Sequence, residues 1–194
     1  MTRLLWSCVI AVVLTAGAAG ADDKKDSDAF EAMRKAATPG AFHKKLEPLV
    51  GSWTWTSKFW FDPSKSPKEG TGTSERKWIL DKRFVAEDVA SKEVFGGPFQ
   101  GFGLMGYDNI QKKYVTVWTD SLTTAISNSI GTVDESGKLF TFHNEVSDPV
   151  SGQKIKGRDV VKIIDDNKHS MEMYKVGPDG KEVKAMEIVF TRKK

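Results

Sequence analysis

The stretch His43-Lys-Lys-Leu46-Glu-Pro-Leu49-Val-Gly51-Ser-Trp53 marks the point where the chain changes from helical to strand periodicity. Phe42, Leu46 and Leu49 recur at the i, i+4, i+7 spacing of one helix face. The proline and the glycine inside the stretch end such a helix. The stretch therefore predicts a short helix that leads into a first strand at Trp53.

Beyond Trp53 the apolar residues occupy alternate positions, which is the period of a strand with one buried face. Trp53, Trp55, Phe59 and Phe61 share one face of this first strand. Later segments repeat the pattern, and turn-forming Gly, Pro, Asn and Asp residues separate them. The expected later strands are Glu69–Ile79, Arg83–Ser91, Phe99–Tyr107, Tyr114–Thr119, Ala125–Val133, Leu139–Val146, Arg158–Ile164, Ser170–Val176 and Val183–Thr191.

About ten strands joined by short connections favour an antiparallel up-and-down meander. A sheet with one apolar face buries that face and loses its open edges when it closes on itself. We therefore expect an all-β fold, a single antiparallel up-and-down β-barrel over residues 38–194 with a short N-terminal helical segment. Gly101, Gly103 and Gly106 in the fourth strand indicate bending or a close approach of another group to the backbone.

The first 21 residues have the three parts of a secretory signal peptide. Arg3 supplies the positive charge, Leu4 to Ala16 is an almost unbroken apolar run, and Ala19-Gly20-Ala21 has the small residues of a cleavage site. We expect cleavage after Ala21, followed by a charged leader and a helix within residues 22–37. The mature protein would then be secreted, to the periplasm or the exterior of a bacterial cell.

Composition narrows the classes of function. Cys8 is the only cysteine and lies in the signal, so we expect a mature chain without disulfides or a thiol nucleophile. The formal net charge of +3 comes from interspersed acidic and basic residues. A nucleic-acid-binding face needs a concentrated basic patch, so we expect no nucleic-acid partner. We also expect no stable membrane anchor after cleavage, and the oligomeric state is left open.

A helical turn, then Gly51-Ser52-Trp53 at the first strand, then Arg192 near the end of the last strand, resembles the lipocalin and fatty-acid-binding superfamily. The resemblance implies a calycin-like barrel in which Trp53 closes one end and Arg192 packs over its ring. A cation–π contact of this kind is worth roughly 1 kcal/mol. His43, Gly51, Trp53 and Arg192 are thus expected to be structural residues.

A longer set of motifs resembles a bacterial secreted family known as domain of unknown function 1579. The resemblance spans Thr38 to Arg192 and implies the same barrel, with no established activity. Lys82 departs from the pattern, which implies a glycine before Arg83, so the resemblance does not imply a tight turn there. The motifs are His43-x-x-Leu46-x-x-Leu49-x-Gly51-x-Trp53, Leu80-Asp-Lys-Arg83-Phe84, Phe102-Gly103-x-x-Gly106-Tyr107-Asp108 and Lys113-Tyr114-x-x-x-Trp118-x-Asp120-Ser121.

The three histidines are the residues best suited to proton transfer or ligation in this chain. His43 lies on the helix before the barrel and is expected to pack under the barrel floor. His143 follows Phe142 on the opposite strand face, and a lumen-facing position is weighed equally with an outward one. His169 follows the turn at Asp165–Asn167 and is expected to be exposed to solvent.

No motif predicts a metal site or a nucleophilic serine, because His-x-x-x-His, Glu-x-x-His and Gly-x-Ser-x-Gly are all absent from the sequence. Some ten-stranded calycin barrels bind haem through one histidine. The resemblance to those proteins would imply the motif Gly-x-Trp-x-Gly-x-Gly at the first strand. Gly51-Ser-Trp53-Thr-Trp55-Thr-Ser57 lacks the later glycines. We therefore expect no cofactor and no metal, and we name no catalytic residue.

Aromatic residues and methionines predict an apolar barrel interior, into which small residues such as Gly103, Thr116 and Ser129 introduce space. A barrel of this strand number is wide enough for one small ligand. Arg83 and Arg158 are candidates to meet an anionic head group. The predicted ligand-binding residues are Trp55, Met105, Trp118, Asn128, His143 and Met173.

The leading hypothesis is a binding module for a small, largely apolar ligand held in the lumen. One alternative is a cavity enzyme, a hydrolase or isomerase that uses His143 as its base. The other is an envelope interaction protein whose barrel is packed. A lumen filled by side chains would contradict the binding module, and an outward His143 would remove the only base of the enzyme.

Overall fold

The computed structural model describes residues 22–148, 151–177 and 179–194, and the expected signal peptide lies outside them. Helix α1 (Asp22–Ala37) begins at Asp22, where the sequence predicts a charged leader and a helix only from Ala29. A short helix α2 (Ala41–Lys44) and a 3₁₀ turn η1 (Glu47–Leu49) follow. Within the described residues, no helix has both the length and the apolar character that crossing a bilayer requires.

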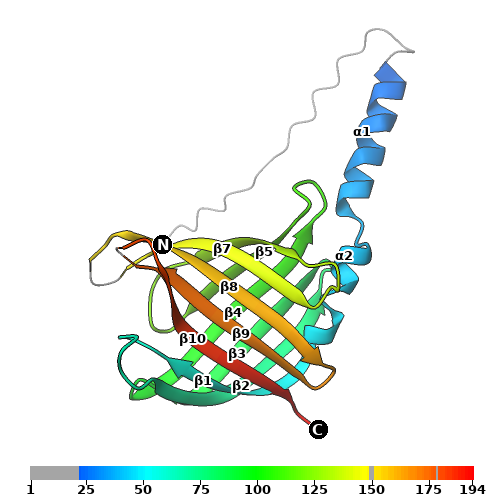
Figure 1. Ribbon diagram of the computed structural model, residues 1–194. Helices are drawn as coiled ribbons and strands as arrows, with labels where there is room; N and C mark the ends of the chain where they lie inside the picture. The colour runs from blue at the N-terminus through cyan, green and yellow to red at the C-terminus, as the bar shows by residue number, and fades with distance from the viewer. Residues whose placement is uncertain (1–21, 149–150, 178) are drawn as a thin grey trace, which may run out of the picture. The chain divides into compact units, whose positions relative to one another are not determined.

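Ten antiparallel strands form one closed barrel (Figure 1). Each strand pairs with its neighbours in the chain, and the first strand pairs with the last. The all-β, up-and-down barrel predicted from the sequence is therefore confirmed. The strands are β1 (Gly51–Phe59), β2 (Lys68–Ile79), β3 (Phe84–Val94), β4 (Gly97–Asp108), β5 (Lys113–Asp120), β6 (Ser127–Val133), β7 (Leu139–Ser147), β8 (Lys154–Asp165), β9 (Lys168–Val176) and β10 (Glu182–Arg192).

The barrel closes between β1 and β10, which lie side by side in Figure 1. In this ladder Trp53 is opposite Arg192 and Phe59 is opposite Met186. Closure pairs both edges of the sheet, so neither edge is left as a template for another chain. It also gives every strand one face toward a common interior, which is where the candidate site lies.

The chain segment before β1 closes one end of the barrel. Leu46 and Leu49 are only 0% and 2% exposed, and they belong to the same core cluster as Tyr114. The Tyr114 hydroxyl donates a hydrogen bond to the carbonyl of Phe42 at 2.8 Å. Phe42 itself is exposed and stacks on Tyr107, so it does not share the buried face that its spacing suggests.

Trp53 lies at this closed end, fully buried and covered by Arg192. The guanidinium carbon lies 4.1 Å from the centroid of the indole, the arrangement that the lipocalin resemblance implies. Arg192 also donates to the carbonyl oxygens of Val50 at 2.8 Å and Pro48 at 3.0 Å. Gly51 has φ 127°, and a Cβ there would lie 2.3 Å from Nη1 of Arg192, so only glycine leaves the guanidinium room.

His43 is buried in the short helix before the barrel, as expected for a structural residue. Its Nδ1 accepts a hydrogen bond from the backbone N–H of Gly40 at 3.0 Å, which satisfies a donor at the start of α2. The ring also meets Tyr107 edge-on. Burial lowers the pKa of His43, so the ring is neutral near pH 7.

A tight turn joins β2 and β3 at the position where Lys82 departs from the family motif. Leu80, Asp81 and Lys82 have φ values of 49°, 53° and 62°. These values lie in the left-handed region, which glycine adopts more easily than any other residue. The missing glycine therefore does not abolish the turn, and Lys82 takes the backbone conformation that a glycine would favour.

Candidate functional site

A cavity of about 490 Å³ occupies the barrel lumen. All ten strands contribute to its lining, because alternate side chains of each strand point inward. The side chains of the barrel therefore do not fill its interior, which is the condition that the binding hypothesis requires. The apolar part of the wall is formed chiefly by Trp55, Met105, Trp118, Phe142, Met171 and Met173.

Glycines opposite the largest rings explain how an aromatic interior leaves space. Three rings of the wall each lie against the backbone of a glycine on a neighbouring strand, where a side chain would collide with the ring. The rings thus follow the wall instead of meeting across the lumen. The pairs are Trp55 with Gly72, Trp118 with Gly101 and Phe142 with Gly131, and a Cβ on these glycines would lie 2.3, 2.5 and 2.5 Å from the ring.

A polar network crosses the inner wall near Trp53. Arg76 on β2 forms an ion pair with Glu87 on β3, with Nη2 2.8 Å from Oε1. The same carboxylate oxygen accepts a hydrogen bond from the Ser74 hydroxyl at 2.6 Å. Nη1 of Arg76 lies 2.6 Å from Nε2 of His169 on β9. One cation and one anion therefore balance each other in this network.

His169 is 1% exposed, so the expectation that it is solvent-exposed is wrong. The turn before it ends at Asn167, and β9 starts at Lys168, which directs His169 inward together with Met171. Its ring stacks on Phe190 with the centroids 4.4 Å apart. Burial, with smaller contributions from Arg76 and Arg192, lowers the pKa of His169 to about 2.

The neutral state of His169 also fixes its proton. Because an arginine only donates hydrogen bonds, Nε2 must accept from Arg76, and the proton resides on Nδ1. Within the part of the chain that the structure describes, this Nδ1 is buried without a hydrogen-bond partner. A histidine with so low a pKa is a weak base near pH 7, so the network suits binding better than proton transfer.

A second polar group stands apart from this network on the inner face of β8. Asp159 lies opposite Phe142 on β7 and opposite Met173 on β9. Its Oδ2 accepts a hydrogen bond from Nδ2 of Asn144 at 2.8 Å. Burial raises the pKa of Asp159 to about 6, and the Asn144 hydrogen bond and the charge of Arg158 offset only part of that rise.

The structure divides the predicted ligand-binding residues into two groups. Trp55, Met105, Trp118 and Met173 line the cavity, although their binding of a ligand stays a prediction. Asn128 and His143 are exposed and lie outside the lining, so neither is placed to bind a ligand in the lumen, and His143 takes the outward one of the two positions considered for it. The reason is the register described next.

On strands β6 and β7, Asn128 and His143 point outward, and the residues next to them in each strand point inward. On β7 the buried Phe142 points inward, so His143 beside it points outward. On β6 Ser129 lines the lumen, while Ile130 is 49% exposed. His143 is therefore not available as the base of a cavity enzyme.

The two arginines considered for an anionic head group also lie outside the lumen lining. Arg158 is bound by Glu182 at the barrel surface, with Nη2 2.6 Å from Oε2. Arg83 lies in the turn after β2 and donates to the carbonyl of Leu80. The charged or titratable residues of the lining that the sequence reasoning did not place in the lumen include Arg76, Glu87, Asp159 and His169.

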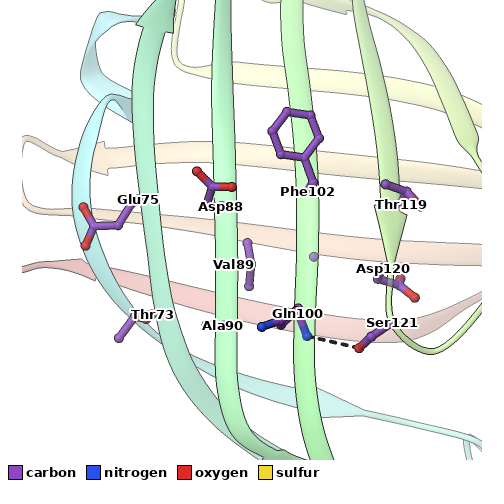
Figure 2. A pocket seen from close by; sticks show the side chains of 11 residues that line it. Thr73, Glu75, Asp88, Val89, Ala90, Gln100, Phe102, Thr119, Asp120 and Ser121 are labelled. Atoms are coloured by element: carbon purple, nitrogen blue, oxygen red, sulfur yellow. Dashed lines mark hydrogen bonds between the residues drawn. The ribbon is translucent and has the colours of Figure 1, made fainter.

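A second hollow, of about 620 Å³, lies over β2, β3, β4 and β5 (Figure 2). Its side chains are spread along four strands, and several, such as Asp88 and Gln100, are exposed. Glu75 is already bound by Ser52 and by Lys193. The backbone N–H of Gln100 donates to Ser121, the bond drawn in Figure 2. These partners leave no convergent set of free polar groups, so we take the lumen as the candidate site.

Among residues 22–148, 151–177 and 179–194, no group of three or more His, Cys, Asp and Glu side chains is placed to hold a metal ion. The lumen can instead enclose an apolar molecule between aromatic rings and methionines. The polar positions that it offers include the Arg76 network and the Asp159 carboxyl group.

Comparison with known proteins identifies one family and similar solved structures. The family model described as "Protein of unknown function (DUF1579)" matches residues 38–192. A search of curated proteins finds no match. The crystal structure of Rv2717c from M. tuberculosis is similar, with a TM-score of 0.60, 14% identity and coverage of 81% of this chain and 100% of that one. A redesigned β-barrel aligns with a TM-score of 0.40, 11% identity and coverage of 82% and 96%. At 14% identity the Rv2717c structure supports the fold alone.

Proposed function

The chain belongs to the DUF1579 family of proteins of unknown function, and on that premise we propose that its barrel is a binding module for a small, largely apolar molecule. The observation that carries this proposal is the cavity of about 490 Å³ inside the closed barrel. Sites for small molecules are commonly concave, mostly apolar and on the order of 300–1,000 Å³. The lumen fits this description in size and in composition.

The energetics favour an apolar occupant. Each Å² of apolar surface removed from water contributes about 25 cal/mol. A ligand enclosed by Trp55, Trp118 and Met173 removes both its own surface and that of the wall from water. The wall is already ordered by the barrel, so little ordering of the protein opposes binding.

We also propose that the protein is exported by its N-terminal segment, which has the pattern of a signal peptide. N-terminal sequencing of protein from the periplasm or culture medium of an expressing bacterium is the test. A mature chain that begins at Asp22 would support export. A chain found only in the cytoplasm with Met1 intact would contradict it.

The alternatives from the sequence lose their support in this geometry. A cavity enzyme based on His143 lacks its base, because His143 is exposed outside the lumen. An interaction protein with a packed barrel is less consistent with the unfilled cavity. Binding is therefore the function that the geometry favours.

Native mass spectrometry of protein purified from its own cellular compartment tests the binding module. The native mass is compared with the mass of the denatured chain, and the purified protein is measured again after incubation with a lipid and metabolite extract. Extra mass that is lost on denaturation supports binding and indicates the ligand class. A bare polypeptide mass in both measurements would contradict the proposal.

A further inference from the structure

We propose that the lumen selects a small apolar molecule that carries a protonated amine, and that the carboxylate of Asp159 is the counter-charge of that amine. The inference rests on the proposed binding function and adds the chemical class of the ligand. It is carried by the position of Asp159 in the cavity and by the absence of a protein cation beside it.

Asp159 differs in its partners from Glu87 and Asp120, the other carboxylates of the lining that are not exposed. Glu87 is neutralised by Arg76 and receives the Ser74 hydroxyl as well. Asp120 accepts hydrogen bonds from the Trp118 indole at 2.8 Å and from a backbone N–H. Asp159 accepts one hydrogen bond, from the neutral Asn144 amide. In the described part of the chain, no lysine, arginine or histidine nitrogen lies within 4.0 Å of its carboxylate oxygens.

Among the described residues, no cation on the neighbouring strands forms an ion pair with Asp159. Arg158, next in the chain, is held at the surface by two hydrogen-bonding nitrogens on Glu182. On β9 the residue opposite Asp159 is Met173. Lys175, two residues farther along β9, also lines the cavity. Lys156 on β8 lines the cavity but is exposed. The carboxylate of Asp159 is therefore without an ion-pair partner among the described residues, and a cation held in the lumen could take that place.

The carboxylate is also oriented for a ligand. The side chain of Asn144 lies over Gly157, where a Cβ would be only 2.2 Å from Oδ1 of Asn144. The missing side chain lets the amide reach across to Oδ2 of Asp159. Oδ1 of Asp159 has no hydrogen-bond partner among the described residues, and Asp159 lines the cavity. Asn144 thus positions the carboxylate and leaves one oxygen for the ligand.

Charge favours an amine over other head groups. A carboxylate surrounded by Phe142 and Met173 is poorly solvated, and an ammonium beside it restores the lost stabilisation through a charge-assisted hydrogen bond. An alcohol can donate a hydrogen bond but supplies no charge. A ligand carboxylate would be repelled at the same position.

Calorimetric titration with decylamine, decanol and decanoate tests the inference, because these probes share one chain and differ in head group. At pH 7.5 we expect decylamine to bind the wild-type protein at least about tenfold more tightly than decanol, and decanoate more weakly than decanol. Asp159→Asn should reduce the preference for amine over alcohol to within about twofold. Asp88→Asn, which removes an exposed carboxylate on the outer face of β3, is the matched control and should keep the preference.

A second arm needs no variant. Lowering the pH from 7.5 to 5 protonates Asp159 while decylamine stays charged, so the affinity of the wild-type protein for decylamine should fall by roughly tenfold. Decanol affinity should not change. His169 does not titrate in this range, because its pKa lies at about 2.

The outcomes separate the two proposals. If decanol binds and decylamine binds no more tightly, or if Asp159→Asn keeps the amine preference, the amine inference is wrong and the binding module stands. If none of the three probes binds the wild-type protein, a lumen site for small apolar molecules is contradicted, and the amine inference is overturned with it.

Discussion

Lys82 occupies a backbone conformation that ordinarily belongs to glycine. With φ at 62°, the side chain costs roughly 1 kcal/mol relative to an extended or right-handed conformation. The ion pair between Lys82 and Glu47, at 4.0 Å and exposed on both sides, contributes little to offset this cost. We expect Lys82→Gly to raise the free energy of unfolding by about 0.5–1 kcal/mol, measured by urea denaturation.

The matched control is Lys77→Gly, an exposed lysine in the interior of β2. Glycine there gains no relief from strain and loses strand propensity, so the unfolding free energy should fall by about 0.5–1 kcal/mol. Opposite signs for the two substitutions are the expected result. A loss of stability in both would show that the Lys82 backbone is not strained.

The titration of Asp159 and His169 gives the protein an unusual pH dependence. Burial lowers the pKa of His169 from 6.5 to about 2, so the unfolded chain takes up this proton first and stability is lost as the pH falls below about 6.5. Burial raises the pKa of Asp159 from 3.8 to about 6, so here the folded protein takes up the proton first and stability is gained between pH 6 and 4. The two contributions oppose each other in that window.

Asp159→Asn removes the compensating gain. We expect the variant to be more stable than the wild type at pH 8, where the wild type holds a buried charge. Its advantage should shrink by about 1 kcal/mol per pH unit between pH 6 and 4. Chemical denaturation at pH 8, 6, 5 and 4 measures this difference. Parallel curves for the variant and the wild type would mean that Asp159 has an ordinary pKa in the folded protein.

Strand periodicity predicts the barrel elements well, because each strand has one continuous buried face. All ten expected strands are present, and only their ends differ by a few residues, as where β8 begins at Lys154 instead of Arg158. The short helix before Trp53 is less regular than its spacing suggests. It breaks into α2 and η1, because Pro48 lies in the second segment.

The same periodicity predicts only some of the residues that face the lumen. On β8, Val161 and Ile163 are buried, and Asp159 shares their alternate positions, so the pattern already contains its inward orientation. On β6 the pattern is inverted, with Ser129 inside and Ile130 outside, because the ring of Phe142 fills the space over Gly131. Such a contact depends on how a ring of one strand packs against the next strand. The pattern of residues within one strand cannot predict it.

The floor segment that comprises α2 and η1 is held mainly by its leucines. Leu46 has no exposed surface and packs into the core cluster of Tyr114 and Phe140. We expect Leu46→Ala to lower the unfolding free energy by about 2–5 kcal/mol, because it removes buried surface and leaves a cavity. Thermal and urea denaturation both report this change.

Ile110→Ala is the control for the floor segment, since Ile110 is 78% exposed in the turn after β4. Its unfolding free energy should stay within about 0.5 kcal/mol of the wild type. If Leu46→Ala were equally mild, the floor segment would not be part of the folded core.

The whole barrel should unfold as one unit, because every strand depends on two neighbours in a closed ring. Far-UV circular dichroism follows the strands, and fluorescence follows the tryptophans, of which Trp53 and Trp55 lie in one core cluster and Trp118 in the lumen wall. We expect the two signals to give coincident urea transitions. A fluorescence change that precedes the loss of strand signal would show that one wall opens separately.

The hydrogen bond between Arg192 and the carbonyl of Val50 joins residues 142 positions apart, and it lies where β10 meets β1. During synthesis β10 is the last strand to leave the ribosome, and until it arrives β1 has an unpaired edge. The pairing of β1 with β10 brings together the two ends of the barrel sequence, and such a long-range contact is slow to form. The lumen is enclosed only when β10 pairs with β1. A chain that ends before Glu182 would therefore have an open sheet and no enclosed space for a ligand.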